Sequence, residues 1–277
     1  MPSGAYSSRL GQITYLFRRM HEDLISSEVS QLLSEARAHE FAHPKEWDEW
    51  DRANLREMER LYRNFCPVNP ALMERKAHLS FEGRHHHQRV LKNNDWEQAK
   101  VFLQEQINLH RQIAESRCEA CGTGMLYETL LQEYMPDTKV ADVERWFGEL
   151  GSATAKLIPE ILEKQQIRPE PVQLNGKYNA ESQMWLNRSL LTLIGFDFER
   201  GGLYETGHNP VEGGTPDDTR LVIKCVNKHN FLESMKSALH EGGHGLYIQG
   251  LPRKEWRYQP VANDLGAAMH ESQALLV

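Results

Sequence analysis

A helical repeat of apolar residues over more than half of the chain limits it to a mostly α-helical fold. From the N-terminus to about residue 165, apolar side chains recur every three or four positions among charged ones, starting with Leu10, Leu16, Met20 and Leu24. The same spacing continues at 47–65, 96–113, 140–161 and 180–193. Pro and Gly clusters separate these stretches, as turns between helices require. We therefore predict a helical body over residues 1–194.

The pattern changes from residue 195 onward. Residues 201–216 contain too many glycines and prolines for a helix. The run at 221–226 is apolar and β-branched, which is typical of a short strand. Residues 195–277 therefore form a separate segment of the same domain, with a small β-strand region.

Two helices are expected after this strand. Asn230 with Glu233 three residues later is a capping-box pattern, and the apolar periodicity behind it continues to Gly250. A second, shorter helix is expected to begin at Asn263 or Asp264 and to include Leu276.

Composition excludes several classes of protein. Of 277 residues, 40% are apolar and 26% charged, so a packed core can form. The net charge of −7 leaves no basic excess for nucleic acid. No apolar run reaches the roughly 20 residues of a membrane span, and the N-terminus lacks a signal pattern. Four cysteines do not form a disulfide framework in a chain of this length. We therefore expect a soluble cytoplasmic protein that binds neither nucleic acid nor membranes.

The sequence His240-Glu241-Gly242-Gly243-His244 lies in the middle of the first of the two expected helices. The histidines are four residues apart, so both imidazoles lie on one helix face and can bind one cation. A catalytic zinc needs a third protein ligand and an open position for water. Glu241 is the candidate general base. The glycine pair lowers helix propensity by about 2 kcal/mol, which indicates that another backbone or a substrate comes close.

Glu271 is the candidate third metal ligand. Tyr247 and Gly250 stand where a class with three histidine ligands would need Gly and His, which excludes that class. Glu271 lies 27 residues after His244 on the second expected helix. A thermolysin-like site would need Asp four residues later, where Leu275 stands. The class with a Glu ligand is therefore favoured, without the thermolysin subtype.

The chain resembles the carboxypeptidase Taq family of zinc metallocarboxypeptidases. The motif HEGGH is followed, 26 residues after its second His, by HESQ. The segments LLTLIGFDFERGGL, LYETLLQEYMPD and MPSGAYSSRLGQ are also similar to family segments. The resemblance implies an elongated, mostly helical metallopeptidase fold with a narrow groove over the metal. It implies that single residues are removed from peptides with a free C-terminus, with broad preference, and that the protein is a possible homodimer.

The resemblance also implies the roles of the site residues. Zinc, or Co²⁺ or Mn²⁺ in its place, would be held by His240, His244 and Glu271. Glu241 would take a proton from water and pass it to the leaving amine. The strand at 221–226 would pair with the peptide backbone along the groove edge.

Candidate substrate-binding residues are less well matched. His208-Asn-Pro210 stands where the family has His-Pro-Phe, and Val222 replaces the last Thr of the Asp-x-Arg-x-Thr motif. We take His208 and Arg220 as candidates, although Arg220 can equally pair with a neighbouring Asp. His270 either supports a metal ligand or lies on the helix surface.

Family members are longer than this chain. We therefore expect a member truncated at both ends and incomplete at its C-terminus, where the family has a basic residue for the substrate carboxylate. Three alternatives remain open: an oligopeptidase-type endopeptidase that cuts inside short peptides, an inactive metal-binding fragment, and a helical interaction module without metal.

Overall fold

The protein consists of two compact units, residues 1–133 and 134–277. The computed structural model describes residues 3–206, 211–225 and 228–277. Each unit has a buried core of its own. The division that the sequence suggested at residue 194 separates the metal-binding segment from the rest, and it stays a prediction.

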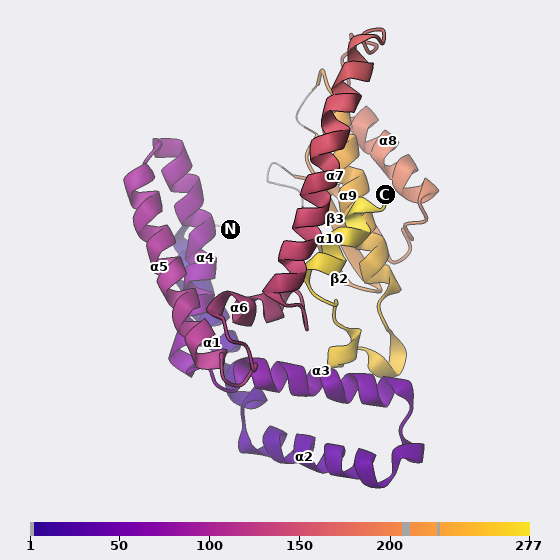
Figure 1. The fold of residues 1–277 in the computed structure, drawn as a ribbon. Helices are drawn as coiled ribbons and strands as arrows, with labels where there is room; N and C mark the ends of the chain where they lie inside the picture. Colours follow the sequence, from indigo (N-terminus) through magenta and orange to yellow (C-terminus); the bar gives the residue numbers. More distant parts are fainter. Residues whose placement is uncertain (1–2, 207–210, 226–227) are drawn as a thin grey trace. The chain divides into compact units, whose positions relative to one another are not determined.

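The first unit is helical. Its helices are α1 (Tyr6–Leu24), α2 (Ser27–Ala42), α3 (Glu49–Phe65), α4 (Pro70–Asn93), α5 (Trp96–Arg117) and α6 (Leu126–Tyr134), whose last residue enters the second unit. Local sequence sets their starts. Asp48 and Asp51 form a capping box at α3, and Asn69 caps α4 in front of Pro70. Helices α4 and α5 lie side by side (Figure 1) and bury the core cluster Val68, Met73, Leu79, Leu109 and Ile113.

In its described residues, the second unit combines four α-helices with a small sheet. Its elements are α7 (Val140–Gln166), α8 (Ala180–Leu193), β1 (Gly201–Glu205), β2 (Val211–Thr215), β3 (Asp218–Ile223), α9 (Leu232–Gly250) and α10 (Ala267–Leu275). The mostly helical fold with a small strand region is thus confirmed. The helices expected at 47–65, 96–113, 140–161 and 180–193 are all present. None of the described helices is long and apolar enough to cross a membrane.

The sheet has the order β1-β3-β2. Strand β3 pairs in parallel with β1 and antiparallel with β2, so it is the central strand. The strand expected at 221–226 therefore begins three residues earlier, at Asp218, and ends at Ile223 in the described chain. Its expected pairing with a substrate backbone is wrong, because both of its edges already bond to neighbouring strands. In the described sheet, β2 is an edge strand instead.

Helix α9 packs between α8, α10 and the sheet. A buried cluster lies on one side of it, formed by Leu191 of α8, Leu221 of β3 and Phe196 from the segment after α8. A Cβ at Gly243 would stand 2.6 Å from the Cα of Ala274, so α10 crosses α9 at backbone distance. A Cβ at Gly245 would stand 2.7 Å from the ring of Phe196. Of the predicted glycine pair, Gly243 thus lets another backbone approach closely, as the cost in helix propensity indicated, whereas a Cβ at Gly242 would meet the side chain of Leu191.

The starts of the last two helices differ from the sequence-based expectation. Helix α9 begins at Leu232 with Phe231 as its N-cap residue, which makes no side-chain capping bond. Asn230 lies one position before the cap, where its side chain accepts a hydrogen bond from the amide of Leu232. Helix α10, however, begins at Ala267 and not at residue 263 or 264. The chain first makes a short 3-10 turn at Pro260–Ala262, and Gly266 then adopts a φ of 94°. This left-handed conformation, which only glycine adopts easily, delays the helix.

Candidate metal centre

Helix α9 presents two histidines on one face. His240 and His244 lie one turn apart in the middle of the helix, as the sequence predicted. Their ring centroids are 4.7 Å apart and their planes meet at 83°. His244 is almost fully buried, whereas the side chain of His240 is 39% exposed. One candidate ligand is thus fixed by packing, and the other borders solvent.

Helix α10 brings Glu271 to both histidines. Its Oε2 lies 3.6 Å from Nε2 of His240 and 3.8 Å from Nε2 of His244. Ligands of a tetrahedral zinc with bonds near 2.0–2.1 Å stand about 3.4 Å apart. These separations are therefore only slightly wider than a bound ion requires. The three residues can hold a divalent metal as a His, His, Glu set.

The ring of His244 is oriented by α10. Its Nδ1 donates a hydrogen bond to the backbone carbonyl of His270 at 3.2 Å. With the proton on Nδ1, the lone pair is on Nε2, which faces Glu271. Burial also lowers the pKa of His244, which favours the neutral ring that a metal needs.

Glu241 is buried beside the ligands. Only 6% of it is exposed, and its Oε2 has no hydrogen-bond partner in the part of the chain that the structure describes. Burial, together with a hydrogen bond and the charge of Glu212, raises the pKa of Glu241 to about 8. A nearby cation would oppose this shift and favour the carboxylate.

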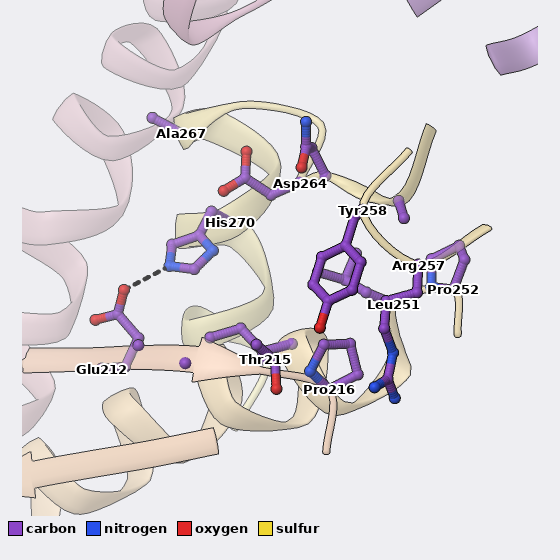
Figure 2. Close-up of a pocket in the computed structure, with 15 residues that line it drawn as sticks. Glu212, Thr215, Pro216, Leu251, Pro252, Arg257, Tyr258, Asp264, Ala267 and His270 are labelled. Atoms are coloured by element: carbon purple, nitrogen blue, oxygen red, sulfur yellow. Dashed lines mark hydrogen bonds and ion pairs between the residues drawn. The ribbon is translucent and has the colours of Figure 1, made fainter. Parts of the chain in front are cut away.

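Glu212, on strand β2, belongs to the site although the sequence did not indicate it. Its Oε1 accepts a hydrogen bond from Nε2 of His270 at 3.0 Å (Figure 2), and its carboxyl group contacts Glu241. Burial is the largest single influence and acts to raise the pKa of Glu212, but the hydrogen bonds from His270, from a backbone amide and from Glu241, with the charge of His244, together lower that pKa. No local pattern marks this residue, since its partners lie 58 and 29 positions further along the chain.

Glu212, His244 and His270 form a second cluster with metal-ligating atoms close together. The ring geometry argues against a metal there. A ligating nitrogen offers its lone pair in the plane of its ring, so two rings must turn their edges toward one ion. The rings of His244 and His270 are stacked instead, with centroids 4.0 Å apart and planes at 12°. His270 thus supports His244, and it does not lie free on the helix surface.

Arg220, one of the two candidate substrate-binding residues, is not brought to this cluster. Arg220 points to the exposed face of β3, whereas its neighbour Leu221 is buried on the opposite face, toward α9. Nε and Nη2 of Arg220 donate hydrogen bonds to the carboxylate of Asp218, at 3.1 and 2.8 Å. His208 lies outside the described residues.

A cavity of about 610 Å³ opens beside the Glu212–His270 pair. Figure 2 shows Pro216, Leu251 and Tyr258 on its far side, with Arg257 at its rim. The lining is largely apolar, and the side chain of Arg257 pairs with Asp217. The cavity can therefore accept an apolar group next to Glu212 and His270.

A sequence comparison identifies the family. The model of the family described as Carboxypeptidase Taq (M32) metallopeptidase matches residues 1–277, the whole chain. The chain belongs to this family. Its members are metallopeptidases, so a divalent metal is part of the family's chemistry, and the His, His, Glu set provides ligands for one.

Individual relatives agree with this assignment. Thermostable carboxypeptidase 1 of Thermus thermophilus is 26% identical over 99% of the chain, and its namesake from Pyrococcus furiosus is 23% identical over 92%. The solved structure of metallocarboxypeptidase 1 from Trypanosoma cruzi superposes on 99% of the chain with a TM-score of 0.85 and 27% identity. That superposition covers 54% of the solved chain. The chain spans about half the length of the curated relatives it matches.

Proposed function

We propose that the chain carries the centre of a zinc-dependent carboxypeptidase that releases single residues from the C-termini of peptides with broad preference. One observation carries the proposal. Two histidines of α9 and Glu271 of α10 converge at metal-binding distances, with the buried Glu241 adjacent. Bound there, the metal would polarise the scissile carbonyl and lower the pKa of a water molecule.

The chain's own residues have distinct roles in this proposal. His240, His244 and Glu271 hold the metal. Glu241, which a bound cation would favour as the carboxylate, takes a proton from the attacking water and gives it to the leaving amine. Its burial excludes bulk water from that proton transfer. His270 keeps His244 in the tautomer that ligates through Nε2.

We further propose that β2 receives the peptide. As an edge strand of the described sheet, it offers unpaired backbone groups, and Glu212 places it next to the metal ligands. An apolar side chain of the peptide would enter the cavity beside Glu212 and His270.

Zinc is the proposed metal, since a His, His, Glu set is a common catalytic zinc site. Co²⁺ or Mn²⁺ can substitute, because geometry and availability decide more than affinity. A cytoplasmic location is supported by the four cysteines, all of which are free thiols.

Metal content tests the first part of the proposal. The purified chain is expected to bind close to one zinc per molecule, and Glu271→Ala is expected to lose most of it. Glu205→Ala removes an exposed carboxylate of β1 and serves as the control. A wild-type chain that takes up no zinc would contradict the proposed site.

Product analysis tests the second part. With blocked tri- and tetrapeptides, a carboxypeptidase releases free amino acids one at a time, whereas an oligopeptidase releases di- and tripeptides. Membership in a carboxypeptidase family favours the first outcome. A chain that binds zinc but releases no product would be the inactive metal-binding fragment.

A further inference from the structure

Glu212 occupies an unusual place for a carboxylate. It lies on the edge strand β2, but its side chain is only 24% exposed and is turned toward the metal ligands. It is paired in register with Leu221 of β3, which is fully buried against α9. Cross-strand partners project to the same face of a sheet, so the strand pairing itself directs Glu212 toward α9.

A continuous series of contacts joins Glu212 to a metal ligand. Glu212 accepts the hydrogen bond from Nε2 of His270, which fixes the rotation of that ring. The ring of His270 is stacked on the ring of His244. The backbone carbonyl of His270 accepts a hydrogen bond from Nδ1 of His244. Rotation of His270 would remove the flat surface against which His244 packs.

We propose that Glu212 is a positioning residue of the metal centre. It holds His270 so that His244 presents Nε2 to the metal, and it acts by its hydrogen bonds rather than by its charge. The inference rests on the proposed function, because it assumes that His244 ligates a metal. It assigns β2 a task beyond peptide binding, since the strand also sets the geometry of the ligands.

Three substitutions separate position from charge. Glu212→Gln loses the charge, but its amide oxygen can accept from His270 and its amide nitrogen can donate to Glu241. Glu212→Asp keeps the charge but is too short to reach both partners. Glu212→Ala removes both functions. We expect zinc affinity, measured by competition with a chelating dye, to fall about 10- to 100-fold for Ala and Asp and to stay near wild type for Gln.

A double substitution tests whether Glu212 acts through His270. If it does, Glu212→Ala combined with His270→Ala weakens zinc binding no more than His270→Ala alone. Two-bond ¹⁵N–¹H spectra of the metal-free protein give an independent measurement. His270, whose Nε2 donates to Glu212, is expected to be the Nε2–H tautomer in the wild type and in Glu212→Gln, and a mixture of tautomers in Glu212→Ala. His244 is expected to keep its tautomer, because its Nδ1 donates to a backbone carbonyl that the substitution leaves in place.

Other results would overturn the inference. Equal zinc affinity of wild type and Glu212→Ala would do so, as would a loss in Glu212→Gln as large as in Glu212→Ala. If Glu212→Ala does not fold, as judged by circular dichroism, the zinc affinities of Glu212→Asp and Glu212→Gln are compared instead, and equal values would overturn the inference. Glu205→Ala is the control for loss of a strand carboxylate. A wild type that binds no zinc would instead contradict the proposed function, so the two failures are distinguishable.

Discussion

At the scale of single residues, Glu241 has the most perturbed environment in the site. Its carboxyl group is buried, one oxygen has no partner among the described residues, and Glu212 lies beside it. A carboxylate in such a place is costly unless a cation is near. The metal-free protein therefore keeps Glu241 neutral over a wider pH range than an exposed glutamate.

Glu241→Gln is expected to stabilise the metal-free protein increasingly as the pH rises. The pKa of Glu241 is raised from 4.5 to about 8 in the folded state. Its contribution to stability is thus fully present below the unfolded value and is lost as the pH rises through the folded value. Gln does not ionise and avoids this loss. In thermal melts with a chelator, the melting temperature of the variant should exceed that of the wild type by a larger margin near pH 9 than near pH 5.

Glu205→Gln controls for the removal of a carboxylate, because Glu205 is exposed. Its melting temperature should follow that of the wild type over the same pH range. A difference between Glu241→Gln and wild type that does not grow with pH would refute the assigned environment of Glu241.

The sequence indicated some site residues and not others, for a physical reason. His240 and His244 are neighbours through the helix repeat itself, so their spacing alone placed them on one face. Glu271 was proposed from its distance along the chain, and the packing of α10 on α9 brings it to the histidines. Glu212 could not be found in this way, because its position depends on strand pairing and on contacts distant in sequence.

At the scale of elements, the crossing of α9 and α10 sets the ligand geometry. Gly243 lets the backbone of α10 approach, since a Cβ there would stand 2.6 Å from both Cα of Ala274 and the carbonyl oxygen of Gln273. Gly243→Ala must therefore push α10 away and move Glu271 with it. We expect a destabilisation of about 1–3 kcal/mol in denaturant titrations, as for other overpacked sites, together with weaker zinc binding.

Gly250→Ala is the matched control within α9. A Cβ at Gly250 meets no atom within 4 Å, so this variant should be neutral or stabilised by about 0.4–1 kcal/mol, with zinc affinity unchanged. If Gly243→Ala bound zinc as tightly as Gly250→Ala, the close helix crossing would not control the position of Glu271.

The long helices were predictable and the sheet was not. Helix α7 follows its apolar repeat from Val140, yet none of its described residues is buried, because periodicity specifies a face and not its partner. Strands β1 and β2 read GGLYE and VEGGT, without the β-branched alternation that marks a strand. They exist because both pair with β3, and such long-range pairing leaves no local pattern.

At the scale of the whole molecule, the metal is expected to stabilise only one of the two units. The proposed ligands all lie in residues 134–277, and the cluster around Ile113 belongs to the other unit. A ligand at 100 times its Kd stabilises the part it binds by about 2.7 kcal/mol. Calorimetry should therefore show two transitions, of which zinc raises one.

Two variants identify the transitions. Ile113 is 1% exposed in the core of the first unit, so Ile113→Ala should destabilise that unit by about 2–5 kcal/mol. The transition that zinc leaves unchanged should then move to a lower temperature. Glu271→Ala should abolish the shift of the other transition. A single transition that responds to zinc and to Ile113→Ala alike would show that the units unfold together. Separate responses would mean that metal binding and the core of the first unit contribute independently to the stability of the chain.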